Sequence, residues 1–206
     1  MEYGEKFNTY THLAGALLAL AGGIVLVVLG ALSGDMWKVI SFSIYGATLV
    51  LLYSFSTLYH NAAHGKLKVF LRKLDHNAIY LLIAGSYTPF TLVSLHGPWG
   101  WSLFGVVWGL ALLGIFQEIW LKKETRRVSL VIYILMGWVA LVAVVPLVAA
   151  LSWAGFAWLA AGGLAYTVGI IFFVNDEKFT HWHGFWHLFV LAGSALHYCA
   201  ILLYVA

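Results

Sequence analysis

Two histidines near the C-terminus are spaced as metal ligands on a helix are. His183 and His187 are four residues apart, so in a helix both side chains lie on one face, one turn apart. Two imidazoles at that spacing can bind one metal ion, and His60 could supply a third nitrogen. Three protein ligands plus water form the open arrangement of catalytic zinc, and zinc is the default metal because no thiolate or methionine ligand is nearby. Hydrogen-bonded packing of the histidine pair is the alternative.

Ser56 and Asp75 could take part in chemistry beside such a metal. Ser56 precedes His60 by four residues and therefore shares its helix face. A serine inside a helix usually bonds back to a carbonyl of its own helix, which is the simpler interpretation. Asp75 begins an apolar stretch, where a carboxylate could serve the chemistry or only interact favourably with the helix dipole.

Two further histidines lie apart from this set. His12 follows Glu5 and Asn8 near the N-terminus, and the three residues could simply cap the first helix. His197 lies ten residues beyond His187. That separation is about 15 Å along a helix, too far to share a metal ion. We therefore interpret His197 as a buried, hydrogen-bonded histidine.

The composition is that of a membrane protein. Hydrophobic residues make up 63% of the 206 and charged residues only 9%, whereas soluble domains carry about 25% charged residues. A helix needs about 20 apolar residues to cross roughly 30 Å of hydrocarbon, and backbone amides in lipid must bond within the chain. We predict an all-α, single-domain, integral membrane bundle of seven transmembrane helices. The predicted spans are residues 11–32, 39–60, 76–95, 100–121, 129–149, 152–174 and 183–204.

Positively charged residues set the predicted orientation. Ten of the 11 lysines and arginines fall in one set of connections, and the other set holds only Lys38. Because basic connections stay in the cytoplasm, we predict a cytoplasmic N-terminus and a C-terminus outside. The candidate residues of the second, third and seventh spans then share one depth near the cytoplasmic face. In the fourth span, Gly105 and Gly109 form a pattern that predicts close helix packing.

Four motifs stand out along the chain: STLYH at 56–60, LDH at 74–76, AGSYTPF at 84–90 and HGFWH at 183–187. Together they resemble the hemolysin III family, within the progestin and adipoQ receptor group. The resemblance covers essentially the whole chain and implies a seven-helix bundle with zinc near the cytoplasmic face. Its ligands would be His60, His183 and His187, Asp75 would hold the water at the metal, and Ser56 would lie beside it.

Three functions remain open at this stage. The set of histidine, aspartate and serine residues is similar to that of alkaline ceramidases, which are membrane amidases. This similarity favours a zinc-dependent hydrolase of lipid amide or ester bonds. A regulator or sensor of membrane state with structural zinc is the alternative. A pore-forming hemolysin is a third function, although the spans are too apolar to line a wide aqueous channel. We expect membrane lipid as the partner, and the net charge of +3 is too small to suggest nucleic acid.

The orientation can be tested with reporter fusions. A reporter fused after Ala206 should be active only if it works outside the cytoplasm, because an odd number of crossings separates the two termini. A reporter inserted at 122–127 should report the cytoplasm. Reversed activities would contradict the orientation and, with it, the cytoplasmic depth of the candidate site.

Overall fold

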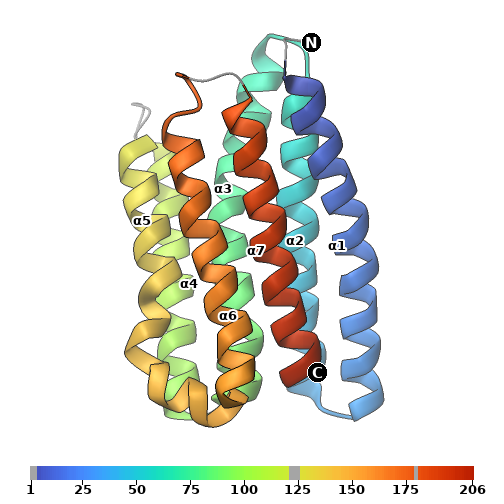
Figure 1. Cartoon of the computed structure of the whole chain (residues 1–206), viewed down its shortest axis with the longest axis vertical. Helices are drawn as coiled ribbons and strands as arrows, with labels where there is room; N and C mark the ends of the chain where they lie inside the picture. The colour runs from blue at the N-terminus through green and yellow to red at the C-terminus, as the bar shows by residue number, and fades with distance from the viewer. Residues whose placement is uncertain (1–3, 121–125, 179–180) are drawn as a thin grey trace.

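The computed structural model describes residues 4–120, 126–178 and 181–206, and every regular element in that part is helical. The helices lie side by side along one long axis (Figure 1). The α-helices are α1 (Glu5–Ser33), α2 (Met36–Asn61), α3 (Lys66–Pro89), α4 (Pro98–Trp120), α5 (Arg126–Trp138), α6 (Val144–Val174) and α7 (Trp182–Tyr204). A π-helical turn, η1 (Phe90–Ser94), extends α3, and a 3-10 segment, η2 (Val139–Ala143), joins α5 to α6.

Close helix packing brings α1, α2 and α7 together. α1 packs against α2 and α7, α2 packs against α3, and α7 packs against α6. A side chain at Gly23 of α1 would lie 3.3 Å from the backbone of Gly46 in α2, so two glycines allow these helices to approach each other. The expected packing at Gly105 and Gly109 is wrong within this chain, because nothing lies within 4 Å of where their side chains would be.

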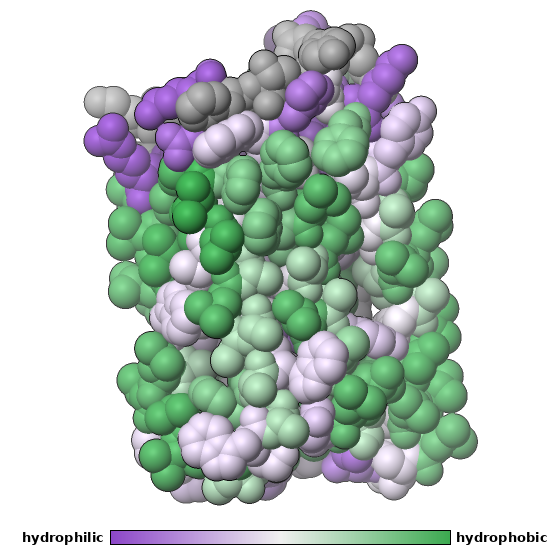
Figure 2. All heavy atoms as spheres, in the orientation of Figure 1, coloured by the Kyte–Doolittle hydropathy of each residue, from purple (hydrophilic) through white to green (hydrophobic). Residues whose placement is uncertain are grey.

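The outer surface is apolar, as a lipid environment requires. Leu18 is 70% exposed and Val145 is 76% exposed, and Figure 2 shows an apolar belt below an end where hydrophilic residues gather. Five helical runs in the described part are long and apolar enough to cross a membrane. The helical class is therefore confirmed, while the count of seven spans and the orientation stay predictions.

Two of the departures from the predicted spans have local causes. α3 begins at Lys66, ten residues before the predicted span, and its first turns carry Lys68, Arg72 and Asp75. The apolar run Arg126–Val174 contains 49 residues, enough for two crossings. Its helix is interrupted at Ser152, whose φ of 63° is non-helical, close to the predicted boundary between residues 149 and 152. Figure 1 shows the chain turning back below α5 and α6.

Candidate metal centre

His60, His183 and His187 meet at one end of the bundle. His60 lies in the last turn of α2, and the other two lie in the first turns of α7. One ring nitrogen from each lies within 4.8 Å of those of the other two, so the three could hold a metal ion. Ring centroids are 5.0 Å apart for His60 and His183 and 4.9 Å apart for each of the other pairs. His60 and His187 are buried, whereas His183 is half-buried.

Two carboxylates orient two of these rings. Nδ1 of His60 lies 2.5 Å from Oε2 of Glu5 in α1, and Nδ1 of His183 lies 2.7 Å from Oδ2 of Asp176. Because a carboxylate accepts the proton carried by Nδ1, Nε2 of each ring is left with its lone pair. Nε2 of His60 is buried and has no hydrogen-bond partner among the described residues. A carboxylate on the remote nitrogen, as at His60 and His183, and an unpaired Nε2, as at His60, are the arrangement found around metal-binding histidines, so the residues fit a metal.

The third ring is oriented by α1. Nδ1 of His187 lies 3.3 Å from the carbonyl oxygen of Asn8 and 3.4 Å from the hydroxyl of Thr11. The carbonyl accepts a hydrogen bond, so this ring also carries its proton on Nδ1. His12 stacks on His187 at 3.6 Å between centroids, with the rings within 8° of parallel. No side-chain cap is found at the start of α1 among the described residues, so the capping function considered for Glu5, Asn8 and His12 is wrong there.

Basic side chains hold both carboxylates in place. Lys68 of α3 donates to Oε1 of Glu5 at 3.0 Å. Arg126 of α5 donates to Oδ1 of Asp176 at 2.7 Å. Burial raises the pKa of Asp176, but the hydrogen bonds from His183 and Arg126 outweigh it and hold that pKa below its usual range. Asp176 is therefore an ionised acceptor at neutral pH.

Ser56 and Asp75 lie beside the histidines. Ser56 is buried, and its hydroxyl makes no hydrogen bond to its own helix in the described part of the chain, while it lies close enough to the carboxyl of Asp75 to interact with it. The expected bond back to its own helix is therefore absent, although the adjacent Thr57 makes one to the carbonyl of Tyr53 at 2.7 Å. Asp75 is half-buried, and Ser56, His60 and His183 are among the groups that act on its carboxyl.

The two remaining predictions concern Asp75, which is not explained by the helix start, and His197, which is a core histidine. Asp75 lies in the third turn of α3, which begins at Lys66, so an interaction with the helix start does not explain it. His197 is buried, and its Nε2 lies 3.1 Å from the carbonyl oxygen of Leu159, as a hydrogen-bonded core histidine should be. Sequence reasoning missed Asp176 and Arg126. The only signal they offered was an acid next to the end of a predicted span and a base in a connection predicted to be cytoplasmic.

Comparison with known proteins gives consistent matches along the chain. A family model described as "Haemolysin-III related" matches residues 3–198. The chain is 45% identical to Hemolysin-3 of Bacillus cereus over 201 residues, covering 98% of this chain and 91% of that protein. It is 44% identical to a Hemolysin-3 homolog of Bacillus subtilis (strain 168), covering 97% of this chain and 93% of that protein. It is also 31% identical to the human Monocyte to macrophage differentiation factor, covering 98% of this chain and 85% of that protein.

Metal binding can be tested with single substitutions. Purified protein should carry about one metal ion per chain, and His183→Ala or His187→Ala should lose most of it because two nitrogens hold the ion poorly. His197→Ala should keep the metal. Metal content is measured by elemental analysis after dialysis against a weak chelator. Equal loss from all three variants would indicate misfolding instead of ligation.

The orienting carboxylates give a finer test with a matched control. Asp176→Asn should lower metal affinity by about 10- to 100-fold, because His183 loses the negatively charged acceptor that fixes its ring. The adjacent Glu177→Gln should have little effect, since Glu177 contacts Arg126 but is 84% exposed. Competition against a fluorescent chelator measures both affinities. Equal affinities in the two variants would contradict the orienting function of Asp176.

Proposed function

The chain belongs to the hemolysin III family, and on that premise we propose that it binds zinc at the cytoplasmic membrane face and hydrolyses an amide or ester bond of a membrane lipid. The observation that carries this proposal is the meeting of three carboxylate- and carbonyl-oriented imidazoles with Ser56 and Asp75. Three ligands leave a fourth position for water or substrate. A purely structural zinc site uses a fourth protein ligand instead, whereas the group of potential ligands found among the described residues consists of three histidines.

The proposal includes seven crossings with the N-terminus inside. The interruption at Ser152 divides the run Arg126–Val174 into two spans, and α3 with η1 supplies the third. α1 begins and α7 ends at opposite ends of the bundle (Figure 1), as an odd number of crossings requires. The basic residues Lys68 and Arg126 lie at the end that carries the histidines. By the positive-inside rule this end faces the cytoplasm.

The side chains around the histidines suit hydrolysis of a carbonyl compound. Zinc at this position would lower the pKa of a water from 15.7 to about 7 and would polarise a carbonyl. Asp75 accepts the proton of the attacking water as general base. Ser56 donates its O–H to the oxygen that gains negative charge, and its hydroxyl is available because no helix carbonyl uses it.

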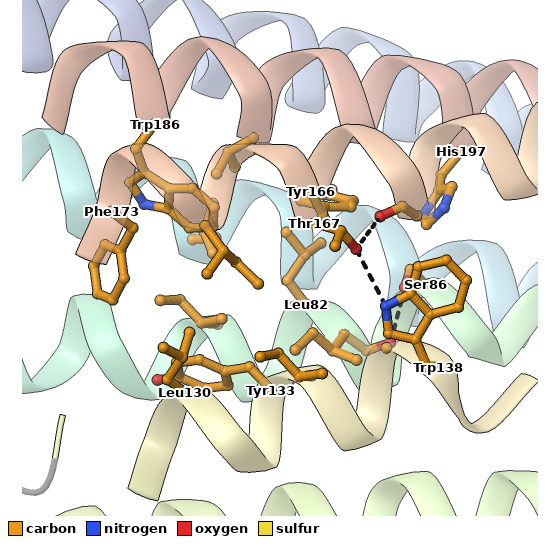
Figure 3. Close-up of a pocket in the computed structure, with 18 of the residues that line it drawn as sticks. Leu82, Ser86, Leu130, Tyr133, Trp138, Tyr166, Thr167, Phe173, Trp186 and His197 are labelled. Atoms are coloured by element: carbon orange, nitrogen blue, oxygen red, sulfur yellow. Dashed lines mark hydrogen bonds between the residues drawn. The ribbon is translucent and has the colours of Figure 1, made fainter. Parts of the chain in front are cut away.

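A cavity beside the histidines suits a lipid chain. It has a volume of about 880 Å³ including its open mouth. Phe173 and Trp186 lie at one end of it, and Trp138 and His197 lie at the other (Figure 3). The Phe173 ring lies 6.3 Å from that of His183, so the cavity begins next to the candidate metal centre. Its lining is mostly aliphatic and aromatic, which favours an acyl chain over a polar metabolite.

The other two functions fit these features less well. A regulator with structural zinc gives no function to the buried Ser56 hydroxyl beside the Asp75 carboxyl. A lytic pore needs a polar channel, whereas the cavity described here is apolar. The name of the Bacillus cereus relative refers to hemolysis by that protein.

Catalysis is tested by removing the base and the hydroxyl separately. Asp75→Asn should keep zinc yet lower turnover by about 10² to 10⁴-fold, because the amide cannot accept a proton. Ser56→Ala should lower turnover by about 10- to 100-fold. Thr57→Val is the matched control, since the Thr57 hydroxyl bonds its own helix. The assay is fatty acid release from ceramide, acyl-amide and acyl-ester probes by purified protein.

Two outcomes would overturn parts of this proposal. Full turnover by the Asp75→Asn variant would exclude Asp75 as the general base. If the wild-type protein releases no fatty acid from any probe of the panel, the result would favour the function as a regulator with structural zinc. In that case Asp75→Asn should change only thermal stability.

A further inference from the structure

The ring of His12 contacts the candidate metal centre but has no part in the proposed hydrolysis. His12 is 3% exposed and lies near the start of α1. It stacks on His187, with 3.6 Å between the ring centroids and 8° between the ring planes. The centroids of the three candidate ligands are 4.9 or 5.0 Å apart. The stack is therefore closer than any contact between the ligands themselves, and it joins α1 to α7.

His187 has the weakest polar support of the three candidate ligands. Nδ1 of His60 and Nδ1 of His183 lie 2.5 and 2.7 Å from carboxylate oxygens. Nδ1 of His187 reaches only uncharged acceptors of α1, at 3.3 and 3.4 Å. Hydrogen bonds to charged groups are roughly twice as strong as neutral ones, and N–H···O bonds longer than about 3.2 Å are weak. Because the χ2 torsion of histidine is broad, these polar contacts alone do not fix the rotation of the His187 ring.

His12 is held in turn by Tyr53 of α2. The two rings make an edge-to-face contact with 5.0 Å between their centroids. The Tyr53 hydroxyl donates to the Ser194 hydroxyl at 2.8 Å and lies 3.4 Å from the carbonyl oxygen of Val190. Val190 and Ser194 follow His187 by three and seven residues in α7, so they share its helix face. The contacts therefore form a closed loop from α7 through α1 and α2 back to α7.

The face of the His12 ring, and not its nitrogens, makes the contact with His187. Both nitrogens are buried and lack a hydrogen-bond partner at normal geometry among the described residues, although the backbone of His187 lies close enough to act on the ring. Atoms of stacked rings at this separation are near the optimum for van der Waals contact, which is about 3.5–4.0 Å. A turn of the His187 ring out of the parallel plane would drive its edge into His12, so the stack limits that rotation.

We propose that His12 is a positioning residue, whose ring face fixes the rotation of the His187 ring and so directs Nε2 of His187 toward the metal. His60 and His183 are oriented by carboxylates, whereas His187 is oriented chiefly by an apolar contact. This inference rests on the proposed function only in that the three histidines bind zinc, and it does not require hydrolysis.

The test compares two apolar replacements, of which only one keeps a flat ring. His12→Phe preserves the stack and should retain most of the wild-type affinity for zinc. His12→Leu fills much of the same space without a flat face and should lower zinc affinity by about 10- to 100-fold, as loss of an orienting group does. Full-length protein in lipid nanodiscs is titrated with Zn²⁺ in competition with a fluorescent chelator.

A substitution elsewhere in α1 separates positioning from general destabilisation. Leu26→Ala is the matched control, because Leu26 is also buried in α1 but lies about 21 Å further along the helix. Its thermal stability should fall, because a large side chain is removed from the core, while its zinc affinity should stay that of the wild type.

The arrangement of the ligands gives a second measurement. Protein saturated with Co²⁺ has a ligand-field absorption spectrum that reports the geometry of the bound nitrogens. His12→Phe and Leu26→Ala should match the wild-type spectrum, and His12→Leu should differ because Nε2 of His187 is no longer held in place. If His12→Leu fails to fold, His12→Ala replaces it with the same expectation.

Three results would overturn the positioning function of His12. The first is wild-type zinc affinity and an unchanged cobalt spectrum in His12→Leu. The second is an equal loss of affinity in His12→Leu and Leu26→Ala, a comparison that holds even if His12→Phe fails to fold. The third is an equal loss in folded His12→Phe and His12→Leu, which would assign the effect to a ring nitrogen. Wild-type protein that binds no Zn²⁺ would overturn the zinc-dependent function as well, whereas zinc binding without hydrolysis would contradict that function alone.

Discussion

A polar side chain within a membrane protein cannot rely on bulk water, so its hydrogen bonds must come from other helices. The three imidazoles at the end of α2 and the start of α7 obey this constraint through Nδ1. One bonds Glu5 of α1, one bonds Asp176 beyond α6, and one bonds a carbonyl of α1. Lys68 of α3 and Arg126 of α5 then neutralise the two carboxylates. Orienting three ring nitrogens therefore requires most helices of the bundle to meet at one end, and the candidate site and the helix packing are parts of the same network.

The candidate ligand set could be predicted from local, one-dimensional information together with the family resemblance. The spacing of His183 and His187 follows from helix geometry, and the distribution of lysine and arginine sets a common depth for His60, Asp75 and the pair. The approach of α1 was not predictable, because Glu5 and Asn8 act on residues more than 50 positions away. For Ser56 the usual bond to its own helix gave the wrong expectation, since sequence shows only that a hydroxyl is present and not what surrounds it.

The same limit applies to glycine. Gly105 and Gly109 have the spacing of a helix contact but face no other helix in the described part of the chain, whereas Gly23 and Gly46, on different helices, allow α1 and α2 to approach. The spacing of glycines in one helix predicts where another backbone could approach. Whether one does depends on which helix lies next to it in the fold. Helix bounds were predicted well where apolar stretches end in polar loops. They were missed in α3, because its charged first turns continue the helix beyond the apolar stretch.

The position of α1 affects how this protein can be handled in the laboratory. Its first two turns contact the ring of His60 through Glu5 and that of His187 through Asn8 and Thr11. α1 thus forms one side of the candidate site and is also one of the helices long and apolar enough to cross the membrane. Deletions or fusions at the N-terminal end would act directly on the geometry of the histidines. The C-terminal end of α7 lies at the opposite end of the bundle (Figure 1) and is the safer place for an affinity tag.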